Sequence, residues 1–399
     1  MNETRKDLKG RKLHNGEIQL SDGRYRYKYY DPMGKQHFVY SWRLDQNDPV
    51  PAGKRKCEAL RQMEKRIEQD SIDHINSSGG NMTVAELVER YVETRTSVRQ
   101  STRMGYRTVI RFLQQDAFGK RSIDSVRVSD AKYWIIKLQQ KDGKGYSSVC
   151  TIRGVVKPAF QMAVDDDILR KNPFSFGLAE VVINNSVIRE AISREEERKY
   201  LAFIESDKHF SRYYEGIYIL FKTGLRISEF CGLTISDIDF EEHCIRVERQ
   251  LQKITGIGYH IEDTKTTNGE RTLPLTKDVE ECFRRIIEKR ESPGREPVVD
   301  GVKGFLYLDK NGAPMYSLHW EKYFQHSVEK YNSIYKVQLP KITPHVCRHT
   351  YCSNMAKSGM NPKTLQYLMG HGDITITLNH YTHVRYEDAK DEIARLNLG

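Results

Sequence analysis

The stretch TPHVCRHTYCSNMAKSGMNPKTLQYLMGHGDITITLNHYTH, residues 343–383, predicts two short helices, then a histidine between glycines, then a tyrosine. Threonine or asparagine followed by proline starts a helix well, because the side chain caps the first turn and proline lacks only an N–H that would have no partner there. Glycine ends a helix because it adopts a left-handed backbone. We expect one helix from Thr343 to Gly359 and a second from Asn361 to Gly370.

Three basic side chains share one face of the first helix. His345, Arg348 and His349 stand at i, i+3 and i+4, so they project on the same side. A guanidinium binds two phosphate oxygens at once, and imidazole can donate or shuttle a proton, so this face suits an anion. A buried helix with polar edges explains the same pattern, and these residues alone leave both interpretations open.

A zinc site is the other chemistry that this stretch permits. His345 and His349 are spaced HxxxH, and Cys347, Cys352 and His371 are close in sequence. However, no glutamate follows the first histidine, as it does in zinc hydrolases, and an arginine occupies the shared face and repels a cation. The pattern therefore disfavours zinc.

Four motifs in a fixed order resemble those of a known family. HVCRH at 345–349, LMGH at 368–371 and the tyrosine at 381 followed by Thr-His are similar to the carboxyl-terminal signature of tyrosine recombinases, also called the phage integrase family. TGLRISEFCGL at 223–233 resembles that family's first-arginine motif. The amino-terminal part is most similar to integrases of conjugative transposons, so the resemblance covers nearly the whole chain.

Cleaving a phosphodiester without a metal requires a nucleophile, cations at the non-bridging oxygens, a proton donor for the leaving oxygen and a base for the nucleophile. The resemblance implies that no metal or other cofactor is used. It assigns the catalytic roles to Arg226, Lys265, His345, Arg348, His371 and the nucleophile Tyr381, with Glu229 and His349 in support.

Two of these assignments have competitors within the chain. Lys265 lies beside a tight turn expected at Asn268-Gly269, and the alternatives are Lys253 and Lys277. Tyr381 lies ten residues after His371, whereas nine is commoner in the family, and the alternatives are Tyr367 and Tyr386.

Composition favours a polyanionic partner in a reducing compartment. The chain of 399 residues has 64 Lys and Arg against 54 Asp and Glu, a formal net charge of +10. We find no apolar run of about 18 residues for a membrane span, and no signal-peptide core at the polar amino terminus. Seven cysteines without a CxxC pair indicate reduced thiols in a cytoplasmic protein.

The segment RYRYKY at 24–29 alternates strictly, so a strand there places Arg24, Arg26 and Lys28 on one face and tyrosines on the other. Flanking strands at 17–20 and 37–42 complete a three-stranded meander, and a helix is expected from Pro51. The basic face is either merely solvated or, as the resemblance implies, part of an arm-type DNA-binding domain over residues 1–75.

Helical periodicity dominates the next part of the chain. Residues 76–82 have the composition of a flexible linker, and 83–174 predict a small helical bundle, which the resemblance makes a core-binding domain. Its helix at 101–114 carries Arg103, Arg107 and Arg111 in one line, either a solvated face or a set of phosphate contacts.

Residues 175–188 read as an interdomain connector, and 189–399 as a catalytic domain. Strands are expected at 243–253, 257–264, 271–275 and 304–308, so this domain is α+β, mainly helical with one small antiparallel sheet. The fold class is therefore multidomain α+β: a sheet-plus-helix domain, an all-α domain and an α+β domain. Tyr386, Ala389, Ile393 and Leu396 form the apolar stripe of a tail helix that packs either on its own domain or on a neighbouring protomer.

These observations predict a site-specific DNA recombinase that works through a 3′-phosphotyrosyl intermediate in excision and integration of a mobile element. A type IB topoisomerase-like nicking-closing enzyme and a non-catalytic DNA-binding regulator are the alternatives. The resemblance implies double-stranded DNA with core and arm sites as partner, a Holliday junction intermediate and a homo-tetramer that exchanges tail helices. It also implies an excision factor and a host DNA-bending protein as further partners, and no membrane.

Overall fold

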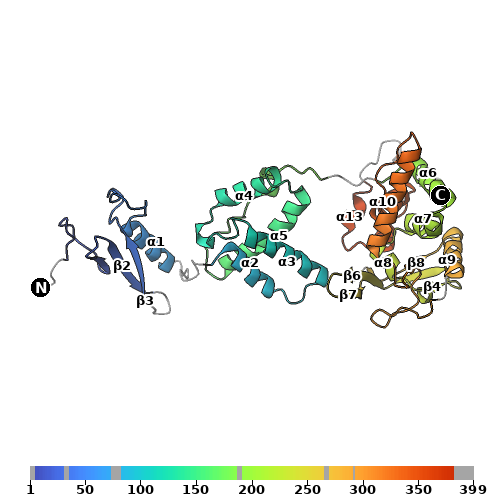
Figure 1. Ribbon diagram of the computed structural model, residues 1–399, viewed down its shortest axis with the longest axis horizontal. Helices are drawn as coiled ribbons and strands as arrows, with labels where there is room; N and C mark the ends of the chain where they lie inside the picture. The colour runs from blue at the N-terminus through green and yellow to red at the C-terminus, as the bar shows by residue number, and fades with distance from the viewer. Residues whose placement is uncertain are drawn as a thin grey trace, which may run out of the picture. The chain divides into compact units, whose positions relative to one another are not determined.

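The computed structural model describes residues 5–30, 36–72, 82–186, 191–264, 269–290 and 293–381 (Figure 1). The chain divides into two compact units, residues 1–187 and 188–399. It is an α+β protein, as the sequence predicts. None of the helices in these described ranges is long and apolar enough to cross a membrane.

The first unit begins with an antiparallel sheet in the order β1-β2-β3. Its strands are β1 (Glu17–Gln19), β2 (Tyr25–Tyr30) and β3 (Gln36–Ser41), so the expected meander is confirmed. Tyr25 and Tyr27 face a small core, in which the buried hydrophobic residues are Leu13, Tyr25, Leu44 and Leu60. The alternation of β2 therefore places its cations on the opposite face.

The helix expected from Pro51 begins later, as α1 (Leu60–Ile72). Long-range contacts bind the backbone that precedes it. Ser41 Oγ donates to the Glu58 carbonyl at 2.6 Å and the Leu60 N–H donates to the Arg43 carbonyl at 2.8 Å. A helix that began earlier would need this carbonyl and this N–H for its own hydrogen bonds. The contacts of the segment with the sheet therefore make the helix begin only at Leu60.

The rest of the first unit is a helical bundle whose helices are α2 (Val84–Glu93), α3 (Gln100–Gln115), α4 (Val128–Gln140) and α5 (Tyr146–Asp165). A capping box between Thr83 and Glu86 starts α2. Phe174 is fully buried in this core, with its ring 5.3 Å from that of Phe160. The helix α5 ends at Asp165, and Asp167 just beyond it adopts a left-handed backbone (φ 55°).

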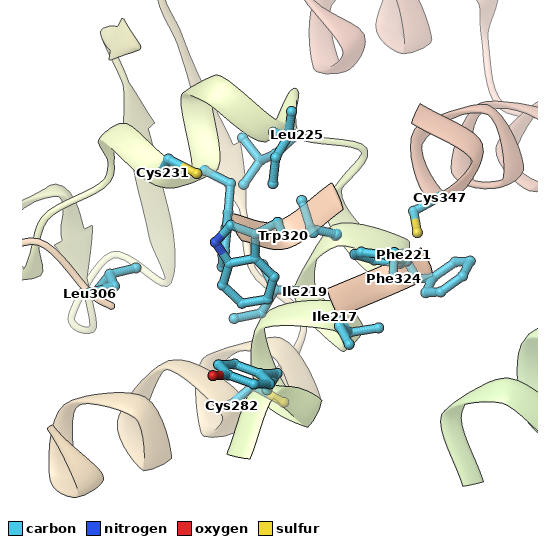
Figure 2. Packing of buried hydrophobic residues seen from close by; sticks show 14 of the residues in the cluster. Ile217, Ile219, Phe221, Leu225, Cys231, Cys282, Leu306, Trp320, Phe324 and Cys347 are labelled. Carbon is cyan, nitrogen blue, oxygen red and sulfur yellow. The ribbon is translucent and has the colours of Figure 1, made fainter. Parts of the chain in front are cut away.

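The second unit is mainly helical. Its helices are α6 (Arg194–Ser206), α7 (Tyr214–Thr223), α8 (Ile227–Gly232), α9 (Lys277–Lys289), α10 (Ser317–Ile334), α11 (Pro344–Lys357), α12 (Pro362–Met369) and α13 (Ile374–Leu378). Trp320 of α10 is fully buried among residues of α7 and α8 (Figure 2). Its ring lies 5.2 Å from that of Phe230 and 5.0 Å from that of Tyr307.

The strands of this unit form two small sheets instead of the single sheet expected. One contains β4 (Ile238–Asp239), β5 (Cys244–Val247) and β8 (Arg271–Pro274), and the other is the hairpin of β6 (Arg249–Ile254) and β7 (Gly258–Asp263). The run 243–253 is thus split between sheets, and β7 pairs with β6 instead of with β8. Periodicity locates strands but does not select their partners.

The strand expected at 304–308 is also wrong. Phe305 and Leu308 make single bridges, to Thr234 and Pro314, without a continuous ladder. Gly304 has a positive φ of 82°, which breaks the extended backbone where that strand would begin.

Candidate active site

Arg348 lies on α11, whose ends follow the sequence prediction closely. Thr343 caps the helix through the Val346 N–H, and the helix ends at Lys357, two residues before Gly359. The Arg348 side chain is buried. Its Nη1 donates to the Gly224 carbonyl at 2.6 Å, and its Nη2 donates to the Met369 carbonyl. The arginine is therefore fixed to two other parts of the chain.

Gly224 makes this approach possible. It ends α7 in a left-handed conformation (φ 64°), and a Cβ there would come within 2.6 Å of the Tyr351 ring and 3.0 Å of the Met369 sulfur. Any side chain at 224 would therefore collide with α11 and α12.

Arg226 stands at the N-cap position of α8, and its side chain reaches the end of α12, which Arg348 also contacts. Its Nη1 donates to Glu229 Oε1 at 2.6 Å, and its Nη2 donates to the Gly370 carbonyl at 2.7 Å. Arg226 and Arg348 thus hold consecutive carbonyls, those of Gly370 and Met369. Two guanidinium groups from distant motifs are brought together, as the sequence predicts.

Glu229 and Arg271 form a buried ion pair behind these arginines. Arg271 Nη2 donates to Glu229 Oε2 at 2.9 Å, and the two side chains are 0% and 1% exposed. Arg271 Nε also donates to the Leu368 carbonyl at 2.8 Å. Arg271 Nη1 also donates to Glu229 Oε1 at 3.3 Å, the oxygen that Arg226 binds, so one carboxylate orients both guanidinium groups.

Arg271 was missed at the sequence level, although a signal was present. In β8 the side chains of Arg271 and Leu273 are buried, while those of Thr272 and Pro274 are exposed. An arginine on the inward face of a strand needs a buried acid, because an unpaired charge is costly there. The expected strand at 271–275 already contained that pattern.

The site carries excess positive charge. Burial lowers the pKa of Arg348 to about 9, and the neighbouring Arg226 contributes. Burial raises the pKa of Glu229, but Arg271, Arg226 and Arg348 outweigh it and hold that pKa below its usual range. Three guanidiniums share one carboxylate, which is the charge distribution of a pocket for an anion.

His371 follows α12 directly and is a neutral imidazole. Burial, followed by Arg348 and Arg226, lowers its pKa to about 3. Nδ1 lies 2.9 Å from Thr377 Oγ1 of α13, which fixes the ring. The left-handed Gly370 ends α12 as predicted, and its carbonyl, which Arg226 binds, directly precedes this histidine.

The two histidines of α11 lie in different surroundings from Arg348. The side chain of His345 is exposed, whereas His349 is half-buried, with its ring 5.8 Å from that of His380. Burial lowers the pKa of His380, and Ser353 Oγ lies 3.1 Å from its Nδ1.

The hydroxyl of Tyr381 is engaged in a hydrogen bond to the backbone. It donates to the Met360 carbonyl at 2.6 Å, and the ring of Tyr381 packs on a cluster that contains Cys352 and Leu365. Burial, with a contribution from Cys352, raises its pKa. Within the described residues, the Tyr381 hydroxyl makes no hydrogen bond to Arg226 or Arg348.

The residues considered as alternatives to Tyr381 and Lys265 make other contacts. The Tyr367 hydroxyl bonds both backbone groups of Thr272. The Lys253 ammonium lies over the rings of Tyr259 and Tyr316, at 4.6 and 4.9 Å from their centroids. Lys277 begins α9. Lys265, Asn268, Tyr386 and the tail stripe lie outside the described residues.

The cysteines considered for zinc are buried in two different hydrophobic clusters. Cys347 belongs to the main core of the second unit and Cys352 to the small cluster that contains Met369. Their thiols therefore pack as apolar groups in separate places.

The candidate DNA-contact residues lie on a sheet face and a helix face. Arg26 stacks over Phe38 at 4.8 Å and Arg24 over Tyr40 at 5.5 Å, on the face of the sheet opposite its core. On α3, Arg107 and Arg111 are exposed, and Arg103 Nη2 donates to the Thr96 carbonyl at 3.0 Å.

Comparison with known proteins identifies the class. A family model described as the phage integrase family matches residues 190–388, and one described as the DNA binding domain of Tn916 integrase matches residues 1–71. The chain belongs to the phage integrase family: it is a tyrosine recombinase, an enzyme that cleaves and rejoins DNA.

Relatives align over the whole chain. The transposase from transposon Tn1545 of Streptococcus pneumoniae is 43% identical over 397 residues, which cover 100% of this chain and 98% of that protein. The transposase from transposon Tn916 of Enterococcus faecalis is 42% identical over the same share of each chain. A structure of the Tn1549 transposon integrase in complex with a circular intermediate DNA has a TM-score of 0.75 and 41% identity. It covers 79% of this chain and 99% of that one.

We expect Glu229→Gln to destabilise the second unit by about 3 kcal/mol, because it leaves Arg271 charged, buried and without its anion. Differential scanning calorimetry of the full chain measures this as a lower unfolding temperature of one transition. Glu281→Gln is the matched control, since its pair with Arg285 is exposed and contributes at most about 0.5 kcal/mol. Equal shifts for both variants would contradict the pairing.

Proposed function

We propose that this recombinase performs site-specific excision and integration of a mobile element, with Tyr381 as nucleophile. The Tyr381 hydroxyl gives its proton to a general base as its oxygen attacks the scissile phosphorus, the bond to the 5′ oxygen breaks, and the leaving oxygen takes a proton from a general acid. The free 5′-hydroxyl of the partner strand then attacks the 3′-phosphotyrosyl bond, and tyrosine regains its proton. Because the bond energy is conserved, no nucleotide cofactor is needed.

The adjacency of Arg226 and Arg348 is the observation that carries this proposal. Both side chains bind consecutive carbonyls in one turn of chain, and the buried Glu229–Arg271 pair sits behind them. A guanidinium that already donates to fixed carbonyls keeps its orientation, so its remaining N–H groups are preorganised for phosphate oxygens. Phosphate would also supply the negative charge that this cluster lacks.

His371 contributes without adding charge. His371 has a pKa of about 3, so it is neutral at working pH and can share hydrogen bonds with an oxyanion or a phenol. We assign His345 to the catalytic group together with His371, His349 to a supporting role, and Lys265 to protonation of the 5′ oxygen.

Tyr381 must leave the Met360 carbonyl before it can react. That hydrogen bond at 2.6 Å and the raised pKa both favour the neutral phenol. Breaking one such bond costs on the order of 1 kcal/mol, so the rearrangement is small compared with the binding energy of a protein–DNA complex. We propose that the engaged DNA complex supplies this change.

We propose three functional parts along the chain: residues 1–75 for arm sites, 83–174 for one side of the core site, and 189–399 for catalysis. The match of residues 1–71 to a DNA-binding domain and the DNA complexes of the Tn1549 integrase support DNA as the partner. The lambda integrase, which is 17% identical, has been solved as a tetramer bound to a Holliday junction. We further propose that the protein acts in the cytoplasm as a homo-tetramer that exchanges tail helices. Its other partners would be an excision factor and a host DNA-bending protein.

A suicide substrate tests the activity directly. A core-site duplex nicked near the cleavage position releases its short 5′-hydroxyl strand after attack, so the covalent complex accumulates and survives on a denaturing gel. A recombinase yields the adduct and also joins two sites in a strand-exchange assay. The topoisomerase alternative predicts relaxation of supercoils without strand exchange, and a non-catalytic regulator predicts no adduct at all.

For the arm domain, we expect Arg26→Ala to weaken binding to arm-site DNA several-fold and to lower the salt dependence of binding by about one counterion. Cleavage of a nicked core site should not change. Lys65→Ala on α1 is the control, because that exposed cation belongs to the helix that covers the other face of the sheet. Titrations at several salt concentrations measure both effects. Equal losses for the two variants would contradict a specific role for the sheet face.

A further inference from the structure

Two buried carboxyl groups between β1 and α1 take no part in the chemistry above. Glu17 on β1 is 0% exposed and Glu64 on α1 is 6% exposed. Ionised carboxylates are rarely buried without a cation, because desolvation and mutual repulsion both oppose it. The neighbours of Glu17 and Glu64 therefore show which groups balance their negative charge.

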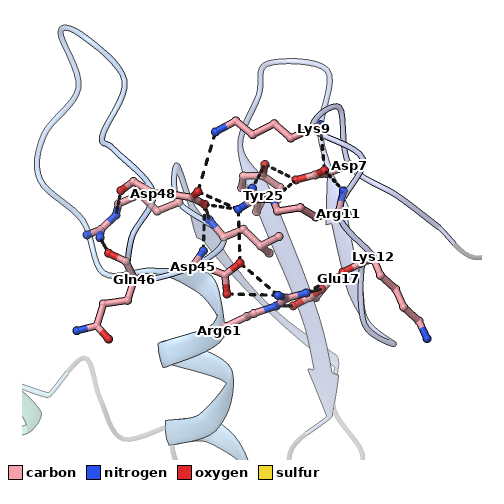
Figure 3. Close-up of polar contacts among 12 residues, drawn as sticks. Asp7, Lys9, Arg11, Lys12, Glu17, Tyr25, Asp45, Gln46, Asp48 and Arg61 are labelled. Atoms are coloured by element: carbon pink, nitrogen blue, oxygen red, sulfur yellow. Dashed lines mark hydrogen bonds and ion pairs between the residues drawn. The ribbon is translucent and has the colours of Figure 1, made fainter.

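Arg61 balances only the first of the two. Its Nε donates to Glu17 Oε1 at 2.9 Å and its Nη2 donates to Glu17 Oε2 at 3.2 Å (Figure 3). The same guanidinium also pairs with Asp45 at 3.2 Å. Arg11, the other nearby cation of this network, is held by Asp7 and Asp48 at 2.8 Å each. Asp45 is contacted by both guanidinium groups, since Arg11 Nη1 also lies 3.4 Å from it, whereas Glu17 has Arg61 alone as its guanidinium partner among the described ion pairs.

Glu64 has no cation of its own within the described part of the chain, and burial together with the neighbouring Glu17 raises its pKa to about 8. Among the described residues no cation forms an ion pair with it, and its buried Oε1 has no hydrogen-bond partner. A carboxylate oxygen in this situation is costly unless something else binds there. The two buried carboxyl groups of Glu17 and Glu64 therefore have one guanidinium between them, and a divalent ion bound there would displace the proton of Glu64 and balance both.

His14 completes a set of ligands. Its Nδ1 lies 3.7 Å from Glu17 Oε1, and one ligand atom from each of His14, Glu17 and Glu64 lies within 4.8 Å of the others. Ligands at about 2.1 Å from one ion lie roughly 3.4 to 4.2 Å apart, so small side-chain movements suffice. The exposed His14 side chain leaves an entry path from solvent.

We propose that His14, Glu17 and Glu64 bind a divalent first-row transition metal such as Zn²⁺. One imidazole with two carboxylates suits zinc, whereas Mg²⁺ and Ca²⁺ select oxygen ligands alone. The ion would tie α1 to β1 and to the segment before it. This role fits a domain whose fully buried core is small, because such domains need cross-links for stability.

Equilibrium dialysis of the full chain against ZnCl₂, followed by metal analysis, tests the site. Wild-type protein should hold one zinc ion more than Glu64→Gln and one more than His14→Gln. Glu68→Gln, an exposed glutamate one turn further along α1, is the matched control and should equal wild type. Zinc bound by the seven cysteines is common to all four proteins and cancels in the difference.

His14 is exposed, so its variant keeps the fold and gives a clear answer even if Glu64→Gln does not fold. Added zinc should also raise the unfolding temperature of wild type more than that of His14→Gln. Equal zinc content in wild type and a folded His14→Gln protein would overturn the proposal, and so would a loss of zinc in Glu68→Gln as large as in Glu64→Gln. Neither result depends on recombination activity.

Discussion

Tyr381→Phe is expected to abolish the covalent protein–DNA adduct, with cleavage reduced by at least about 10³-fold. The substitution removes the attacking oxygen and one hydrogen bond, that to the Met360 carbonyl. The ring still fills its place beside Cys352 and Leu365, so stability should change by only about 1 kcal/mol. Nicked core-site substrate and a denaturing gel provide the measurement.

Two other tyrosines serve as controls for this loss. Tyr386→Phe and Tyr367→Phe should retain the adduct, since the Tyr367 hydroxyl is engaged with the backbone of Thr272. Affinity for an uncleaved core site should be equal in all four proteins. An adduct formed by Tyr381→Phe, or lost in Tyr386→Phe alone, would move the nucleophile to another residue.

The second large effect is expected for Arg226→Lys and Arg348→Lys, each with cleavage reduced by about 10² to 10³-fold. Arg348 donates to the Gly224 and Met369 carbonyls at once. An ammonium group keeps the charge but cannot hold two fixed acceptors and still present a planar fork to phosphate. The single-turnover cleavage rate at saturating protein isolates this effect from DNA binding.

Arg107→Lys provides the matched control, because that arginine is exposed on α3 and keeps its charge as lysine. It should cleave at the wild-type rate. Calorimetry of each variant separates a folding defect from a chemical one, since Arg348 also holds α7 and α12 together. Wild-type cleavage by a stably folded Arg348→Lys protein would contradict the proposed fork.

Local chemistry made much of this structure predictable. The helix starts at Thr343 and Asn361 and the left-handed stop at Gly370 depend on neighbouring residues, and all three are found. Alternation in β2 likewise predicts which face meets the core, because side chains of a strand point alternately to its two faces.

The remaining features depend on contacts between distant segments. The division of 243–253 between two sheets follows from partners that no local pattern specifies. The late start of α1 reflects the hydrogen bonds that Ser41 and Arg43 make with the backbone of Glu58 and Leu60. The link from Arg271 to Glu229 and the contact of Tyr381 with Met360 appear only once the chain has folded.

The most direct test of the central claim is a structure of the Tyr381→Phe protein bound to an intact core-site duplex. We predict that the guanidinium groups of Arg226 and Arg348 both contact the non-bridging oxygens of one phosphate, with the residue 381 ring released from Met360 and facing that phosphorus. Arginines on two different phosphates, or a scissile phosphate that touches neither, would contradict the account.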